Sequence, residues 1–576
     1  MIFIFRLPIC RPPSASLALI LLLVLLLGPR MAVAAGLAAV AAPDRHGTET
    51  AEAVLSAGGN AVDAAVATAF VLAVTYPEAG NLGGGGFVTL SHRGANYFLD
   101  FREVAPASAS RDMYLDADGR PIVGASTIGH RAAGVPGTVA GLWALHARFG
   151  TLPWRRLLEP AIALARDGFV PERQLLERIA AARDDYAGKT NFDDYFGALS
   201  PDKPFRQREL AATLTRIARE GPRGFYEGRT ARLIESEMRR GRGLISRQDL
   251  LSYRALWREP LIVRWRGFEL VTAPPPSSGG IALAQLLGIK DLMAADFAGA
   301  EHNSSRYVHL VAEIQKRVFA DRAEYLGDPD FTTVPVTRLI APEYLRQRAA
   351  EIQRDRPSAP ERIRAGLRES LETTHFSILD PDGNALSLTY TLNGSFGNGV
   401  VVRGAGFLLN NEMDDFSVKP GQPNLYGVIG GKANEIVPGK RMLSSMTPTV
   451  ILEEGRVRMI IGTPGGSTIF TSVFQAIVNR IDFRMSTAQS VAAPRFHHQL
   501  IPPNLIVYSR CCTLSSETID SLRGIGYRVE KSPWEFGDLQ LIDIDSAGEV
   551  TAASDPRGRG VSRVFSVPTN RAVRAE

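Results

Sequence analysis

Cysteine is scarce in this sequence, which has three in 576 residues, and two of them, Cys511 and Cys512, are adjacent. A disulfide framework needs several spaced cysteines, and a bond between neighbours is strained. We therefore expect no disulfide-stapled fold and interpret the pair as two buried or partly buried thiols. His497 and His498 also lack partners at metal-ligand spacing, so we expect them to be structural and predict no metal site.

Long hydrophobic runs are absent after the first 30 residues. Before that point, basic residues precede an apolar run at 17–27 and an Ala-Val-Ala sequence that ends at Ala34, as in a secretory signal peptide. The apolar run is shorter than the roughly 20 residues of a spanning helix. We predict a signal peptide at 1–34, a periplasmic or secreted protein, and no other membrane span. An uncleaved anchor is the alternative.

A strong excess of charge is missing too. The formal charge is +5, and Arg6, Arg11 and Arg30 supply three of those charges within the predicted signal peptide, so the remainder is +2 (5 − 3). No long basic run is present. Nothing in the charge pattern therefore indicates a nucleic-acid partner.

Four consecutive glycines at 83–86 raise the question of a phosphate site. They lack the Lys-Ser/Thr ending of a phosphate-binding loop and the spacing of a dinucleotide site. We expect close backbone packing there instead, and no cofactor.

The sequence that is present mixes helices and strands. Asn60 is typical of a helix N-cap and predicts a helix that starts there. Pro77 lies past the end of this predicted helix. Segments 353–371 are charged, contain two prolines and lack an apolar period, which indicates an exposed, mobile linker or processing region. We predict further helices around 136–149, 153–167, 210–219 and 306–325, a hairpin turning at Arg93-Gly94, and strands in "GVVVRGAGFLLNN", "TPTVILEEGRVRMIIGTPGG" and "NLIVYS". Layered sheets covered by helices are the expected architecture.

One further hairpin is unusually rich in hydroxyls. Strands at 373–379 and 385–392 flank Asp380-Pro-Asp-Gly-Asn384, where a three-residue loop gives a register in which paired numbers sum to 764. Thr373 then faces Thr391, on a face that also carries His375. The other face is apolar, so a half-solvated sheet explains the pattern without any chemistry.

A threonine hydroxyl is a weak nucleophile unless a base lies close to it. An N-terminal threonine can use its own α-amine as that base, which here requires cleavage of the Glu372–Thr373 bond. From the pattern alone, the structural interpretation is preferred.

Ten motifs together carry a family resemblance. "TTHFSILDPDGNALSLTYTLNGSFG" resembles the start of the small subunit of γ-glutamyltransferases (γ-glutamyltranspeptidases), which are N-terminal-nucleophile hydrolases. The similarity extends, in order, over "GGNAVDAAVA", "GNLGGGGF", "DFREVAP", "GVPGTVAG", "APPPSSGG", "GKRMLSSMTPT", "GTPGGS", "PRFHHQ" and "SDPRG", from about residue 58 to 558. Each glycine-rich piece is weak alone, but their number and order make the assignment specific.

The resemblance implies a four-layer αββα sandwich and a self-cleaving precursor. A large chain at 35–372 and a small chain at 373–576 would stay together in one body. The implied activity is cleavage of glutathione and other γ-glutamyl amides, with transfer of the γ-glutamyl group to water or to amino acid or dipeptide acceptors. No metal or organic cofactor is implied.

The resemblance also assigns residues. Thr373 would be the nucleophile, Thr391 its hydrogen-bond partner, and Gly465 and Gly466 the backbone donors to the oxyanion. The implied contacts to the substrate's α-carboxylate and α-ammonium are Arg102, Asn393, Glu412, Asp415, Ser444 and Ser445.

Each of these residues has a plainer interpretation. Arg102 alone could form a surface salt bridge with Asp100 or Glu103, and a run of acids such as "EMDD" is usually solvated. Asp414 is the neighbouring alternative to Asp415 and is expected to be structural. Two serines in a loop are commonly turn residues.

The segment 419–434 resembles the lid loop of many bacterial members, with Tyr426 as the shielding residue. An irregular surface loop is the alternative there. For the whole chain, one alternative is a cephalosporin or glutaryl acylase of the same superfamily. Another is an uncleaved, inactive binding homologue.

Overall fold

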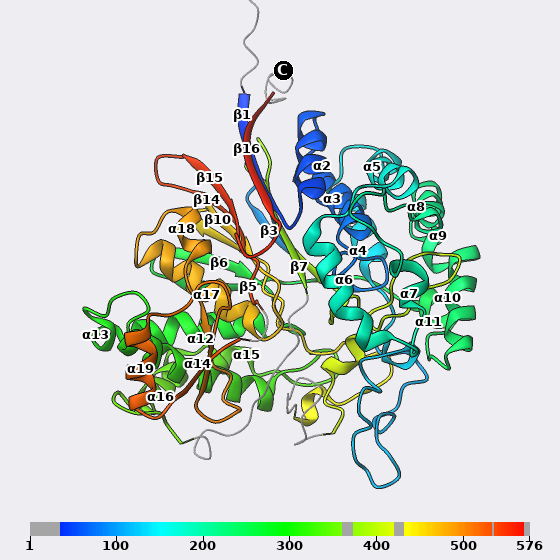
Figure 1. Ribbon diagram of the computed structural model, residues 1–576. Coiled ribbons are helices and arrows are strands. Elements are labelled where there is room, and N and C mark those ends of the chain that lie inside the picture. Colours follow the sequence, from blue (N-terminus) through cyan, green and yellow to red (C-terminus); the bar gives the residue numbers. More distant parts are fainter. Residues whose placement is uncertain (1–34, 360–372, 420–430, 533–534, 569–576) are drawn as a thin grey trace, which may run out of the picture.

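Two β-sheets stack face to face in the computed structural model, and helices cover the outer face of each (Figure 1). The structure describes residues 35–359, 373–419, 431–532 and 535–568. The arrangement is the αββα sandwich that the sequence predicts. Within the described ranges, no helix is long and apolar enough to cross a membrane.

The first sheet has seven strands in the order β16-β1-β7-β8-β2-β3-β4. The paired strands are antiparallel, and β1 and β16, from opposite ends of the chain, lie side by side (Figure 1). The strands are β1 (Ala35–Ala42), β2 (Gly85–His92), β3 (Ala95–Asp100), β4 (Leu256–Arg258), β7 (Thr374–Leu379), β8 (Ala385–Thr391) and β16 (Val561–Pro568).

Helix α3 (Ala61–Thr75) is the innermost helix over this sheet, because every one of its residues is buried. Asn60 and Asp63 form a capping box at its start, as expected from the sequence. The surrounding helices are α2 (Arg45–Ser56), α4 (Thr138–Phe149), α5 (Trp154–Asp167), α6 (Arg173–Tyr186), α7 (Phe192–Phe196), α8 (Arg208–Glu220), α9 (Arg223–Tyr226), α10 (Gly228–Arg240) and α11 (Arg247–Ser252).

The second sheet has six strands in the order β15-β14-β10-β9-β6-β5. They are β5 (Leu261–Trp265), β6 (Phe268–Thr272), β9 (Thr449–Glu453), β10 (Arg456–Gly462), β14 (Gln540–Ile544) and β15 (Val550–Ser554). Its helical layer contains α12 (Gly279–Leu292), α13 (Ala294–Phe297), α14 (Ser305–Tyr325), α15 (Val336–Leu339), α16 (Pro342–Ala350), α17 (Thr468–Ile481), α18 (Thr487–Ala492) and α19 (Ser516–Gly524).

The remaining elements are short. A small third sheet is made of β11 (Phe496–His497), β12 (Leu505–Tyr508) and β13 (Arg528–Lys531). The 3-10 turns within the described residues are η1 (His130–Ala132), η3 (Glu412–Asp415) and η4 (Lys432–Asn434). The predicted helices at 136–149, 153–167, 210–219 and 306–325 correspond to α4, α5, α8 and α14.

The register of the hydroxyl-rich hairpin is confirmed. Thr374 pairs with Tyr390 and Leu379 with Ala385, so paired numbers sum to 764 as predicted. The strands themselves are each one residue shorter than expected, because β7 begins at Thr374 and β8 ends at Thr391. The predicted hairpin at Arg93-Gly94 is also present, with both residues at positive φ.

The half-solvated interpretation of this hairpin is wrong, because every residue of both strands is buried. The polar face lies against the second sheet: Ser387 Oγ donates to the carbonyl of Ile461 at 3.1 Å, and Ser377 Oγ donates to that of Gln540 at 3.0 Å. Alternation of polar and apolar residues reports which face carries hydroxyls. It does not report whether water or another sheet covers that face.

His375 lies in the same polar layer and supplies a pH prediction. Burial lowers the pKa of His375 to about 3, from an ordinary value of 6.5. Below about pH 6.5, His375 therefore binds a proton in the unfolded chain but not in the folded chain. The free energy of unfolding falls as pH falls from 6.5 toward 3. Urea unfolding of a His375→Gln variant, which can still bond Thr389 and Ser377, should show a shallower loss over this range than the native chain. Equal pH slopes would contradict this account.

Two smaller expectations are also wrong. "GVVVRGAGFLLNN" forms a turn with an isolated bridge between Val401 and Leu408 instead of a strand, because Gly404 and Gly406 adopt positive φ and reverse the chain. Cys511 is exposed and Cys512 half-buried, so the two thiols do not both lie inside.

Candidate active site

Thr373 and Thr391 meet where the central hairpin opens. The Oγ1 atoms are 3.4 Å apart, and the two residues are 6% and 3% exposed. Thr391 Oγ1 also accepts a hydrogen bond from the amide of Asn393 at 2.8 Å. The predicted pairing of the two threonines is therefore present, and it is nearly closed to solvent.

The glycine run at 83–86 packs directly against Thr391. A Cβ on Gly84 would lie 2.0 Å from the Thr391 carbonyl oxygen, and one on Gly86 would lie 2.4 Å from that of Thr389. Asn81 Nδ2 donates to the same Thr391 carbonyl at 2.9 Å, while its Oδ1 accepts from Gly84. These glycines therefore allow close backbone approach, as the sequence indicates, and fix the end of β8.

Asn393 connects the threonines to a group of charged residues. Its backbone lies at φ 74°, and its Nδ2 donates to the carbonyl of Asn411 at 3.0 Å. Asn411 in turn accepts from the amide of Gly394 and donates to the carbonyl of Thr127. Because Glu412 follows Asn411, this chain of bonds sets the start of η3 beside the hairpin.

Arg102 follows β3 and is the centre of the charged group. Its guanidinium is 1% exposed, lies 2.6 Å from Glu412, contacts Asp415, and is 3.6 Å from Glu103. Its backbone amide donates to Asp100, and its carbonyl accepts from Tyr253 and Arg441. The surface salt bridge considered from the sequence is excluded, because Arg102 and Glu412 are both buried.

Burial and mutual repulsion set the protonation of these acids. Burial raises the pKa of Glu103 to about 8 despite the opposing charge of Arg102, and burial raises that of Glu412 well above its usual range. Burial opposes the charge of Arg102, yet the nearby acids raise the pKa of Arg102 above its ordinary value. The group therefore holds one permanent cation beside two acids, Glu103 and Glu412, whose protonated forms are favoured by burial.

A second buried cation, Arg322 of α14, was not anticipated from the sequence. It donates to Ser445 Oγ at 3.2 Å and to Ser278 Oγ at 3.0 Å. Burial and the charge of Arg102 lower its pKa to about 10, against the opposing effect of Asp415. The available signal was a cation on the apolar face of a predicted helix, where burying a charge is costly.

Arg322 and Asp415 line one small hollow of about 10 Å³, together with Asn434 and Leu443. That volume holds about one water molecule. Ser444 lies beside Ser445, where its amide donates to Pro276 and its carbonyl accepts from Ser278. The two serines therefore sit in a fixed, buried segment, and the turn-only interpretation does not describe them.

Gly465 and Gly466 form the turn between β10 and α17. Their φ values are 133° and 52°, and a Cβ on Gly465 would lie 2.4 Å from Thr468 Oγ1. Within the described part of the chain, neither amide donates a hydrogen bond. The turn is close to the hairpin, since a Cβ on Gly462, at the end of β10, would lie 2.3 Å from the His375 ring.

The structure thus brings Arg102, Glu412 and Asp415 together and links them to Thr373. Asp414 points elsewhere and accepts from Ser126, as expected for a structural residue. Glu372, Tyr426 and the signal segment at 1–34 lie outside the described residues, as do most of the linker at 353–371 and the lid segment at 419–434.

The adjacent histidines are both buried and hydrogen-bonded within the protein. His497 contacts Thr471 and Gln499, and the amide of His498 donates to Gln315. Over the ranges that the structure describes, no group of three His, Cys, Asp or Glu side chains is placed to hold a metal ion.

Comparisons with known proteins show which family the whole chain resembles. Residues 47–565 match the family described as gamma-glutamyltranspeptidase. A glutathione hydrolase proenzyme of Pseudomonas aeruginosa is 58% identical over 527 residues, which cover 91% of this chain and 94% of that protein.

Two solved structures are also similar. The gamma-glutamyltranspeptidase of Pseudomonas nitroreducens complexed with L-DON is 56% identical, with a TM-score of 0.56. The matched region covers 56% of this chain and 96% of that chain. A cephalosporin acylase from Bacillus halodurans is 25% identical, with a TM-score of 0.79, and covers 97% of this chain and 99% of its own.

Proposed function

The chain belongs to the gamma-glutamyltranspeptidase family of enzymes, and we propose that it cleaves the γ-glutamyl amide bond of glutathione and related γ-glutamyl compounds. Water or an amino acid or dipeptide then accepts the γ-glutamyl group. The observation that carries this proposal is the hydrogen-bonded path from Thr373 to the buried cluster of Arg102, Glu412 and Asp415.

Self-cleavage activates the enzyme in this proposal. The Thr373 hydroxyl attacks the carbonyl carbon of Glu372, the C–N bond breaks, and an ester and a free Thr373 α-amine result. Water then opens the ester and leaves chains 35–372 and 373–576. These chains stay together because β7 and β8 of the small chain lie between β1 and β2 of the large chain in one sheet. Export through the segment at 1–34 belongs to the same proposal.

Turnover uses the same hydroxyl. The Thr373 α-amine takes the hydroxyl proton as Oγ1 attacks the γ-amide carbon, and it returns that proton to the departing amine. Thr391 orients Oγ1, and the amides of Gly465 and Gly466 donate to the oxyanion, where each is worth roughly 3–4 kcal/mol. Attack by water or an amine on the γ-glutamyl ester then releases Thr373.

Head-group recognition replaces an internal ion pair. Arg102 contacts Glu412 and Asp415, and the adjoining hollow of about 10 Å³ is much smaller than a γ-glutamyl group. We assign the α-carboxylate to Arg102 with Ser444 and Ser445, and the α-ammonium to Glu412, Asp415 and Asn393. The α-carboxylate thus compensates the charge of Arg102, and the α-ammonium compensates the acids from which Arg102 is separated.

These acids distinguish the proposal from the acylase alternative, because a glutaryl group has no ammonium to pair with them. With matched anilides, we expect γ-glutamyl release to exceed glutaryl release by about 100-fold or more, the scale of one buried charge interaction. Faster release from the glutaryl anilide would favour the acylase.

Arg322 gives a further prediction, because a guanidinium can only donate and therefore turns the Ser445 hydroxyl hydrogen away from itself. We propose that Arg322 positions Ser445 toward the α-carboxylate. Arg322→Gln should raise the KM for γ-glutamyl anilide about tenfold with little change in kcat, because one charge-assisted contact is weakened. Arg322→Lys should partly restore KM. An equal fall of kcat in both variants with KM unchanged would refute this positioning role.

A further inference from the structure

A basic groove lies outside the site described above. Its volume is about 430 Å³, and the cationic side chains in its lining are Arg131, Lys189, Arg240, Arg403 and, when protonated, His130. None of the residues that line it is an aspartate or a glutamate. The cations come from four separate segments: η1, the loop after α6, the end of α10, and the turn at 401–408. Their convergence is therefore a product of the fold and not of a basic run in the sequence.

Glu237, a residue of α10, is a buried acid that contacts several of the groove cations. It is 1% exposed, lies 3.1 Å from His130 Nε2 and 2.9 Å from Arg403 Nη1, and contacts Arg240. Burial opposes ionisation of Glu237, but the bonds from His130 and Arg403 and the adjacent positive charges lower its pKa below the usual range. A buried carboxylate therefore fixes two guanidinium groups that are 49% and 42% exposed.

The cations exceed the acids that contact them. The carboxylates paired with the four groove cations within the described residues are Glu237 and Asp194, which leaves a charge of +2 (4 − 2) before His130 is counted. Lys189 donates to the carbonyl of Asp185, and Arg131 to that of Met113, so neither is neutralised by these bonds. Gly241 makes room for the ring of His130, because a Cβ there would lie 1.8 Å from His130 Nδ1.

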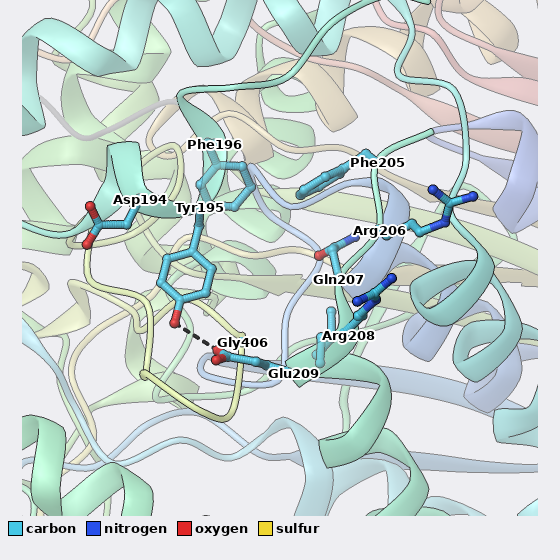
Figure 2. A pocket seen from close by; sticks show the side chains of 10 residues that line it. Asp194, Tyr195, Phe196, Phe205, Arg206, Gln207, Arg208, Glu209 and Gly406 are labelled. Atoms are coloured by element: carbon cyan, nitrogen blue, oxygen red, sulfur yellow. Dashed lines mark hydrogen bonds between the residues drawn. The ribbon is translucent and has the colours of Figure 1, made fainter. Parts of the chain in front are cut away.

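A neighbouring hollow shows the contrast. Figure 2 shows this cavity of about 370 Å³, in which Tyr195 donates to Glu209 on one side while Arg206 and Arg208 lie on the other. Asp194 and Glu209 balance the two arginines of that lining. Its charge is mixed, so it favours no class of ion, whereas the basic groove has one sign.

We propose that the basic groove is a binding site for a small multivalent anion that carries at least two carboxylate or phosphate groups. Two negative groups match the uncompensated charge, and guanidinium forks suit planar or tetrahedral oxyanions. The segment 125–129 forms one wall of the groove. The Gly129 amide donates to the Asn398 carbonyl, and the Thr127 carbonyl accepts from the Asn411 side chain. The site therefore adjoins the residues that carry the substrate head group, although its existence does not depend on the proposed function.

Calorimetric titration of the purified processed protein at constant ionic strength tests this site. Citrate and pyrophosphate are the multivalent probes, and acetate is the monovalent control. The Arg131→Gln/Lys189→Gln variant should bind the preferred probe about tenfold or more weakly, because two charge-assisted contacts are lost. The matched variant Arg173→Gln/Lys203→Gln, which removes two exposed charges elsewhere, should bind as the native protein does.

Preference for citrate would assign a carboxylate ligand, and preference for pyrophosphate a phosphate ligand. Melting temperatures of both variants report whether they fold, and Lys189→Gln alone replaces the double variant if it does not. The proposal is overturned if the native protein binds neither probe, or if the groove variant and the matched variant bind the probes equally well.

Discussion

Replacing Thr373 by alanine should leave a single uncut chain without turnover. Both steps use the same hydroxyl, first on the Glu372 carbonyl and then on the γ-amide. Its loss should lower kcat on the order of 10⁶-fold, the scale seen when a catalytic nucleophile is removed. A denaturing gel and release of chromogenic anilide from a γ-glutamyl substrate measure the two effects.

Thr374 offers a matched control one residue away. It is fully buried, and within the described residues its hydroxyl has no hydrogen-bond partner. Thr374→Val should therefore be cut and remain active, since it keeps the shape of the side chain at the start of β7. If the Thr373→Ala variant still splits at the same bond, or if Thr374→Val fails in the same way, a nucleophile at Thr373 is wrong.

Replacing Arg102 by methionine should have the next largest effect. The guanidinium is the buried cation that contacts Glu412 and Asp415, and it would receive the α-carboxylate. Truncating one partner of a buried charge pair between two molecules costs roughly 2–5 kcal/mol of binding free energy, which corresponds to about 30- to 4,000-fold in kcat/KM for a γ-glutamyl substrate. Steady-state kinetics should show most of this loss in KM.

Loss of the Arg102 guanidinium leaves Glu412 and Asp415 without the cation that they contact. This complicates the interpretation of the Arg102→Met variant and also provides its control. Arg102→Met leaves Glu412 buried without its cation, so its melting temperature should fall. Adding Glu412→Gln should recover part of the stability, because Glu412 then no longer repels Glu103 and Asp415, but it should not recover activity. Recovery of turnover together with stability would mean that Arg102 serves the fold and not the substrate.

Local features of the fold could be predicted from the sequence. The register at Thr373 follows from a short loop and the two-residue period of a strand, and the cap at Asn60 follows from the chemistry of helix ends. Both depend on neighbours within a few residues. The strand expected near Val401 does not form. Its absence also has a local cause, because two glycines with positive φ reverse the chain there.

The composition of the site depends on contacts across hundreds of residues, which no local pattern encodes. Arg102, Arg322 and Asp415 come from three segments that meet only when both sheets and α14 pack together. The family resemblance supplied Arg102 and Asp415, whereas the sequence marks Arg322 only as a cation on the apolar face of a helix. Burial likewise could not be inferred for the hydroxyl face of the hairpin, because alternation does not reveal what covers a face.

Above all, we propose that Thr373 becomes an N-terminal residue and carries the γ-glutamyl group. The most direct test is mass spectrometry of peptides from enzyme that is acid-quenched during turnover of a γ-glutamyl substrate. The account predicts a small chain that begins at Thr373, with a γ-glutamyl mass added on that residue. A small chain that begins elsewhere, or an adduct on another side chain, would contradict it.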